Sequence, residues 1–247
     1  MALPRLSTIV WASAVLLGAP LVAQQVVSAR AGLITFFQGS AFVDGQHAPL
    51  RAARFPQMKD GETLATARGR VELLLAPGAV LRLGENAQIR MDDTRLADTQ
   101  ITLQQGDILI EIWQLPDGNR IQVRLGDTIT ELARTGLYRF GTAQNTVRIY
   151  GGEAVVRSGA ATATAKRGMA VDLNPSLAVK KFDRKQTDLL HAWAARRSFD
   201  LFMSDPDARR NQTHWQFSRV GYMDNPNFGV EFRALTRLRL SPPPFSR

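Results

Sequence analysis

The sequence predicts a mainly β protein in which one α-helix and an irregular C-terminal segment follow an all-β domain. Three observations predict this class. Apolar and polar residues alternate from residue 31 to about residue 174. Gly, Pro and Asn clusters interrupt the alternation at intervals of about 8–12 residues, which is typical of a sandwich, barrel or roll. Long amphipathic helical windows are missing from this region, so a parallel α/β fold is excluded.

Residues 1–23 have the order of a secretory signal peptide. Arg5 precedes an apolar run from Ile9 to Leu17, and Pro20 then comes before the small residue Ala23. We expect cleavage after Ala23 and export to the periplasm. An uncleaved membrane anchor is the alternative, but a spanning helix needs about 20 apolar residues and this run is shorter.

Residues 24–178 are the predicted all-β domain, and residues 70–91, RVELLLAPGAVLRLGENAQIRM, show its pattern. Successive side chains of a strand point to opposite faces, so Leu73 and Leu81 belong to a buried face, with Glu72 and Arg82 opposite. The other alternating sets are Ile101/Leu103, Ile108/Ile110/Ile112, Ile121/Val123/Leu125, Val147/Ile149 and Met169/Val171/Leu173. The intervening glycines predict tight turns, because none of them has the setting of a nucleotide-binding loop.

Residues 179–205 are the predicted amphipathic helix. Asp183, followed three positions later by Gln186, has the spacing of a capping box, and Pro206 ends the pattern. The apolar side comprises Leu189, Leu190, Trp193 and Ala194. We expect this side to pack on the sheet; a groove on a partner protein is the alternative.

Residues 206–247 form a segment rich in aromatic and basic residues with a Pro-rich tail. Arg237 and Arg239 alternate with leucines, as on the solvent face of a last strand. Pro242, Pro243 and Pro244 predict an extended end without structure of its own.

The strands, in this order, resemble the FecR domain, a periplasmic all-β module of bacterial envelope proteins. The likeness is carried by GETLAT (61–66), the segment 70–91, ITLQQGDILIEI (101–112), TGLYRF (135–140), VRIYGGEAVV (147–156), AKRGMAV (165–171) and, more weakly, the helix FDRKQTDLLHAWAARRSFDL (182–201). It covers about residues 31–175 and extends to about residue 203. The resemblance implies a jelly-roll-like or β-helical roll without catalytic residues that acts in envelope sensing or protein contact.

The chain departs from the family at its N-terminus. Signalling FecR members relay from outer-membrane receptors to a sigma factor through a cytoplasmic segment. Only Met1–Ser7 precede the apolar run here. We therefore expect the external module alone and do not carry the sigma-factor role over.

Residues that could carry chemistry are few. The chain has no cysteine, and its histidines, His47, His191 and His214, lack the spacing of metal ligands. No serine lies in a Gly-x-Ser-x-Gly turn. We therefore predict no catalytic residue, no metal site and no cofactor.

Two groups of carboxylates were weighed against this prediction. Asp92, Asp93 and Asp98 could attract a cation, but MDDTRLAD lacks the alternating ligands and glycine of a calcium loop. A glycosidase needs two carboxylates that face one cleft, and Asp107, Glu111 and Asp117 are the candidates. A hydrolase is the third hypothesis for the function, and we expect the protein not to be an enzyme.

Two binding functions remain. The first is a non-catalytic periplasmic module that contacts another envelope protein in signalling or scaffolding. The alternative is a module that binds an anionic or carbohydrate envelope polymer, suggested by a net charge of +9, or +8 after loss of Arg5. Export excludes nucleic acid as the natural partner. The residues predicted to make contacts are Trp193, Arg196, Arg197, Arg233, Arg237 and Arg239.

Overall fold

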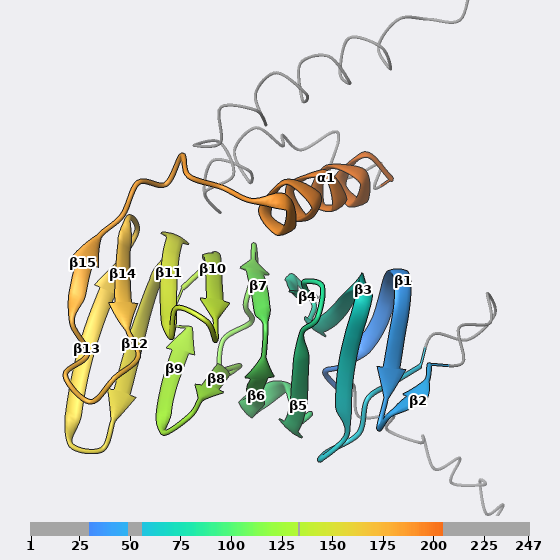
Figure 1. The fold of residues 1–247 in the computed structure, drawn as a ribbon, viewed down its shortest axis with the longest axis horizontal. Helices are drawn as coiled ribbons and strands as arrows, with labels where there is room; N and C mark the ends of the chain where they lie inside the picture. The colour runs from blue at the N-terminus through green and yellow to red at the C-terminus, as the bar shows by residue number, and fades with distance from the viewer. Residues whose placement is uncertain (1–29, 49–55, 133, 205–247) are drawn as a thin grey trace, which may run out of the picture.

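The computed structural model describes residues 30–48, 56–132 and 134–204. The predicted signal peptide and the C-terminal segment, with Arg233, Arg237 and Arg239, lie outside the described residues. The strands are β1 (Leu33–Val43), β2 (Gln46–His47), β3 (Thr63–Ala76), β4 (Ala79–Leu83), β5 (Gln88–Asp93), β6 (Thr99–Gln105), β7 (Asp107–Ile112), β8 (Ile121–Leu125), β9 (Thr128–Leu132), β10 (Gly136–Gly141), β11 (Thr146–Gly151), β12 (Glu153–Ser158), β13 (Ala161–Lys166), β14 (Met169–Asp172) and β15 (Val179–Lys181). A 3₁₀ turn, η1 (Leu96–Asp98), precedes β6, and one helix, α1 (Leu189–Ser204), follows the strands (Figure 1). The predicted mainly β class is confirmed.

All the strands belong to one nearly closed sheet, ordered β13-β12-β9-β8-β6-β5-β3-β4-β7-β10-β11-β14-β15, with β1 paired to β3 and β2 to β1. The sheet folds into two layers. One layer holds β4, β7, β10, β11, β14 and β15, and the other holds β5, β6, β8, β9, β12 and β13 (Figure 1). The long strand β3 belongs to both, because Thr63–Ala65 pair with β5 and Val71–Ala76 pair with β4.

The change of layer along β3 depends on a pair of glycines. Gly39 of β1 lies opposite Gly69 of β3, next to a register shift. A Cβ at Gly39 would lie 2.2 Å from the carbonyl oxygen of Arg68, and one at Gly69 would lie 2.6 Å from that of Gln38. Gly39 also has a φ of +79°. Only glycine allows the two backbones to approach this closely where they bend.

The main core lies between the two layers. The residues that the alternation assigned to the buried face are buried there, from Val71 and Leu73 to Val171 and Leu173, with Met169 partly buried. The alternation was therefore sufficient to predict the inward face. It did not predict that Glu72 and Arg82, on the opposite face, would have no exposed surface.

The helix is shorter than the predicted 179–205. Val179–Lys181 form β15 against Met169–Val171, and the Phe182 N–H donates to the carbonyl of Gly168, so the chain leaves the sheet only after residue 182. The capping box at Asp183 was wrong: its carboxylate accepts the N–H of Lys185 in a turn. Asp188 caps α1 instead, accepting the His191 N–H at 2.9 Å. No helix among the described residues is long and apolar enough to cross a membrane.

We expect Ile110→Asp to prevent folding. The Ile110 side chain has no exposed surface in the core between the layers, so the variant would bury an unpaired carboxylate and lose ~1.5–3 kcal/mol of apolar burial. Circular dichroism and thermal melting measure the result. Gln104→Asp, at an exposed position of β6, is the matched control and should melt like the wild type. A folded Ile110→Asp protein would contradict the inward assignment of β7.

Candidate functional site

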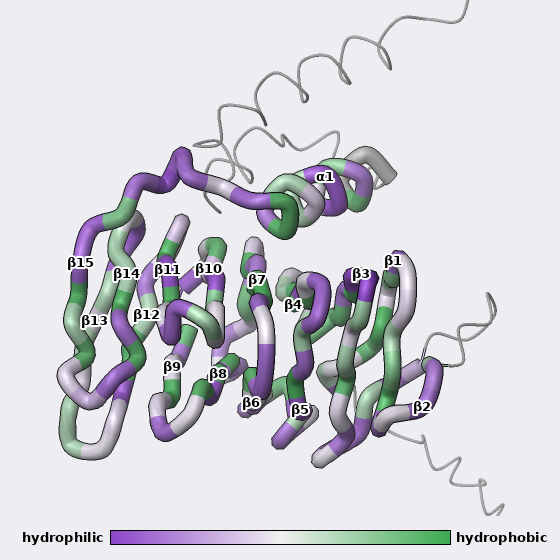
Figure 2. Tube along the Cα trace, in the orientation of Figure 1, coloured by the Kyte–Doolittle hydropathy of each residue, from purple (hydrophilic) through white to green (hydrophobic). Residues whose placement is uncertain are grey.

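The predicted contact residues of the described chain all lie on α1, which crosses the outer face of one layer. Figure 1 shows α1 running above the ends of β7, β4 and β3. A second apolar cluster joins it to the sheet, made of Leu109, Leu137 and Tyr150 from the strands and Leu190, Ala194, Ala195 and Phe199 from the helix. Polar and apolar residues alternate around the helix (Figure 2). Of its predicted apolar side, Leu190 and Ala194 are buried against the sheet and Trp193 packs beside them, as expected. The prediction was wrong for Leu189, which is 76% exposed because it lies at the first turn, where the helix has not yet reached the sheet. Where α1 covers it, this layer is therefore buried on both faces.

A group of charged side chains lies beneath the helix. Glu72, Arg82 and Glu111 come from the neighbouring strands β3, β4 and β7 and are 0%, 0% and 3% exposed. Arg82 donates from Nε to Glu72 Oε2 at 2.8 Å and from Nη1 to Glu111 Oε2 at 2.6 Å. One buried arginine thus bridges two buried carboxylates.

The helix completes this group from above. Arg197 donates from Nη2 to Glu72 Oε1 at 3.1 Å, and the Ser198 hydroxyl donates to Glu111 Oε2. Burial pushes the pKa of Glu72 up, but Arg82 and Arg197 together outweigh burial and hold that pKa below its ordinary value. We call these five residues, Glu72, Arg82, Glu111, Arg197 and Ser198, the buried ion network. Its two arginines balance its two glutamates in charge.

The buried ion network sets the position of α1 on the sheet. A buried ion pair adds little net stability, but removing one partner leaves an uncompensated charge and costs several kcal/mol. Sliding or lifting the helix would separate Arg197 from Glu72 and Ser198 from Glu111. The network therefore fixes one register of the helix, while the apolar cluster holds it down.

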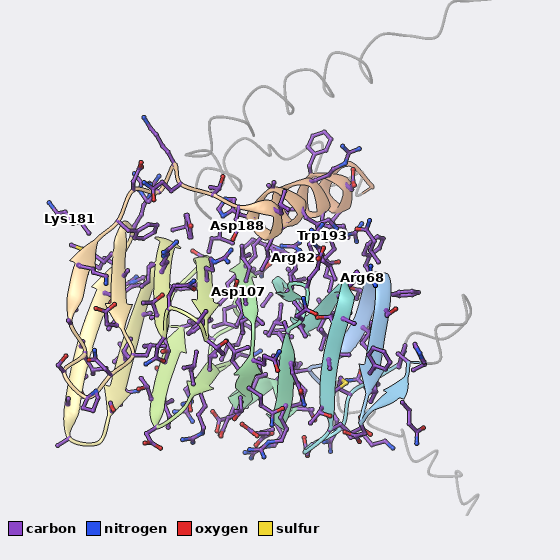
Figure 3. All side chains as sticks on the ribbon, in the orientation of Figure 1. Arg68, Arg82, Asp107, Lys181, Asp188 and Trp193 are labelled. Atoms are coloured by element: carbon purple, nitrogen blue, oxygen red, sulfur yellow. The ribbon has the colours of Figure 1, made fainter. Side chains whose placement is uncertain are left out.

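Cations and aromatic rings stack at the solvent edge of the network. The Arg197 guanidinium lies 3.8 Å from the ring centroid of Phe36, whose ring lies 6.2 Å from that of Trp193. Arg70 lies 5.9 Å from the Trp193 ring and pairs with Glu85 at 3.0 Å. Figure 3 shows Arg82 beneath α1 and Trp193 on the side of α1 toward β1 and β3.

The structure separates the predicted contact residues from one another. Trp193 and Arg197 are half-buried and share the stack, and Arg197 is also tied into the buried ion network. Arg196 is exposed. Of the three, Arg196 is the one whose guanidinium stays at the surface, and an interaction role for each stays a prediction.

The start of α1 is tied to the sheet as well. Arg139 of β10 pairs with Asp188 and, at 2.9 Å, with Asp107. The His191 ring is buried with its centroid 4.7 Å from that of Tyr150, whose hydroxyl donates to the carbonyl of Gln186 at 3.2 Å. Burial lowers the pKa of His191 to about 4; Asp188 opposes this effect and Arg139 adds to it.

Apart from Asp117, the carboxylates that could suggest chemistry pair with arginines of the protein. Asp92, Asp93 and Asp98 pair with Arg90, Arg95 and Arg120 respectively. Of the glycosidase candidates, Glu111 belongs to the buried ion network, Asp107 pairs with Arg139, and Asp117 lies in the turn between β7 and β8. Within the described ranges, no group of three or more His, Asp or Glu side chains could hold a metal ion.

Sequence reasoning missed Glu72, Arg82, Ser198 and the role of Arg197. A signal was present, because Glu72, Arg82 and Glu111 all fall on the outward side of strands that are otherwise apolar. Opposite charges at outward positions of such strands can indicate a covered face. Their pairing needs the strand order β3-β4-β7, which the alternation does not contain.

We expect Arg82→Met to destabilise the protein by ~3–5 kcal/mol, because it leaves Glu72 and Glu111 buried without their shared cation. Urea denaturation measures the loss. The matched control is Arg90→Met, which removes the partly exposed pair with Asp92 and should cost ~1 kcal/mol or less. Equal losses in the two variants would contradict the role of the buried ion network.

The stability of the protein should fall as the pH is lowered from about 6.5 to about 4. An unfolded histidine has a pKa of about 6.5, so in this window the unfolded chain binds a proton at His191 that the folded chain does not. The full effect is ~3 kcal/mol by linkage. The free energy of unfolding of the wild type and of His191→Phe is measured at several pH values. The variant should lose the pH dependence of stability above pH 5. Parallel profiles of the two proteins would contradict the assignment to His191.

Comparison with known proteins adds little. No protein-family model matches the chain, and no curated protein matches it. Two crystal structures of a "putative anti-sigma factor" from Parabacteroides distasonis ATCC 8503 are similar to it, with TM-scores of 0.40 and 0.39 and 11% sequence identity. Each alignment covers 54% of this chain and 62% of that chain, so this chain matches less than two thirds of that protein's length.

Proposed function

We propose that the chain is a non-catalytic, FecR-like module of the bacterial cell envelope that is exported to the periplasm and binds another envelope protein. The ordered set of FecR-like strand motifs supports the family, and the N-terminal signal pattern supports export. The role is contact, in signalling or scaffolding, and not turnover.

The observation that carries this proposal is that many carboxylates of the described residues form ion pairs within the protein. Carboxylates that pair with arginine or lysine are Asp60, Glu62, Glu72, Glu85, Asp92, Asp93, Asp98, Asp107, Glu111, Glu131, Glu153, Asp172 and Asp188. A catalytic acid or base must be able to reach a substrate and exchange its proton with it. Glu72 and Glu111, the buried members of this set, are held in ion pairs that keep the shape of the molecule, which is what a scaffold for protein contact requires.

A polymer-binding module is the second candidate. The stack of Trp193, Phe36 and Arg70 favours it, because aromatic rings beside cations can bind sugar faces and anions. Binding of this kind would weaken as salt rises, since the Debye length shortens from about 10 Å at 0.1 M to about 3 Å at 1 M.

The proposal is tested in living cells. A photo-crosslinking amino acid is placed at Arg196 in α1, at Thr164 in β13 or at Arg124 in β8, three exposed positions. We expect a discrete adduct with one envelope protein at one or two positions and none at the others, and a periplasmic product that begins at Gln24. A cytosolic product that keeps residues 1–23, or no protein adduct at any position, would overturn the proposal.

A titration with purified cell-wall polymer at low and high salt separates the two candidates. We expect no binding at either concentration. Salt-sensitive binding that is lost in Trp193→Ala, in the absence of a protein adduct, would establish the polymer-binding function instead.

A further inference from the structure

The sheet has two free edges at the end of the molecule remote from α1. The strand order begins at β13 and ends at β15, so among the described residues β13 pairs only with β12, and β15 only with β14. Figure 1 shows both strands at the same end of the roll, one in each layer. Half of the backbone N–H and C=O groups of an edge strand point away from its neighbour and can pair with another strand.

Of the edges, β13 is the least protected. It pairs with β12 over six residues without a register shift, contains no proline and carries a charge only at its last residue, Lys166. The edge strand β1, by contrast, has register shifts next to Phe36 and Ala41 and is partly covered by β2. β15 has three residues, of which Lys180 and Lys181 are charged. Bulges, short length and lysines are the means by which natural edge strands avoid pairing.

The core is open beside this edge. Ala161 and Ala163 of β13 and Met169 of β14 pack on the main core and are partly buried, and Val179 of β15 is 45% exposed. Because Val179 pairs with the buried Val171, it is on the core side of its strand. A strand added to β13 with apolar residues at alternate positions would cover these side chains and extend the core.

The charge at this end indicates the chemistry of the partner. Basic residues outnumber acidic ones there. Six lie on β13, β15 and the turns beside them: Lys166, Arg167, Lys180, Lys181, Arg184 and Lys185. The acidic residues are Glu153 of β12, which pairs with Lys166 at 3.6 Å, Asp172 of β14, which pairs with Lys180 at 2.7 Å, and Asp183. Figure 2 shows the segment between β15 and α1 as mainly hydrophilic, and Figure 3 shows Lys181 at the outer side of β15. Two copies related by a two-fold axis would pair antiparallel and place the basic end of each β13 beside the uncharged Ala161 end of the other, so self-pairing offers these cations no acidic partner.

We propose that β13 is the docking edge for an extended, acidic segment of the partner protein, which adds as a strand beside Ala161–Lys166. The segment has alternating apolar residues toward Val179 and Ala163 and acidic residues near Lys166 and Lys181. This inference rests on the proposed function and names the surface that carries it out.

The probe is a labelled, end-capped peptide, Glu-Val-Thr-Val-Glu-Val-Thr, titrated into the full mature chain and followed by fluorescence polarisation. Three matched peptides accompany it. Two carry N-methyl groups on alternate residues, one peptide for each phase, and the third has lysine in place of glutamate. We expect saturable binding of the acidic peptide. The lysine peptide, and the N-methylated peptide whose blocked N–H groups face β13, should bind at least tenfold more weakly. No binding, or equal binding of all the peptides, would overturn the inference.

Variants of the protein locate the site. Lys166→Glu and Lys181→Glu change exposed side chains. Each variant should bind the acidic peptide at least fivefold more weakly and the lysine peptide more tightly than the wild type does. Lys59→Glu, an equally exposed lysine elsewhere, is the control and should change neither. Thr164→Pro, tested only after its circular dichroism matches wild type, should abolish binding by disrupting the edge. Loss of binding in Lys59→Glu as well would point to bulk charge and overturn the inference.

Two outcomes separate this inference from the proposed function. A photo-adduct with an envelope protein at Arg196 but not at Thr164 would keep the function and reject this edge. A dimer in sedimentation analysis that Thr164→Pro abolishes would make a second copy the occupant and reject the acidic partner. An adduct at Thr164 together with binding of the acidic peptide supports both.

Discussion

The arrangement of the molecule depends on one interaction: Arg82, with no exposed surface, held between Glu72 and Glu111 under the helix. These charges lie on the outer face of a layer whose inner face already packs in the main core. Without α1, water would solvate the charges on this face. Because α1 removes that water, each charge needs a partner of opposite charge or a hydrogen bond at a defined place. Arg197 and Ser198 of the helix meet that need.

This interaction gives the two layers different characters. In one layer, the strands β4, β7 and β10 are covered on both faces, by the core and by α1. The other layer, with β13 at its end, packs on the core alone among the described residues, and the outward residues Thr162, Thr164 and Lys166 are exposed. At the helix end of the roll, the buried ion network therefore fixes the position of α1. At the opposite end, the edge strand β13 has backbone N–H and C=O groups that pair with no strand of the described residues. The unpaired edge of β13 is the surface on which the proposed partner strand would add.

The same constraint bears on chemistry. Residues whose types suggested an active site, Glu111 and Asp107, are engaged with arginines that hold strands and helix together. His191, the one buried histidine among the described residues, lies in the helix–sheet contact against Tyr150, where burial favours its neutral form. These ionisable groups thus hold the helix and the strands in place.

The sequence by itself determined the β class, the inward face of the strands and the presence of an amphipathic helix packed on the sheet, because side-chain periodicity is local and repeats at every second residue. It did not determine that Glu72, Arg82 and Glu111 are neighbours, since their strands are brought together only by the sheet order. It also misplaced the helix start, because Val179–Lys181 follow the pairing offered by β14 and not their local pattern. The tertiary structure alone decided which charges are buried and which edge is free, since both depend on contacts between residues far apart in the chain.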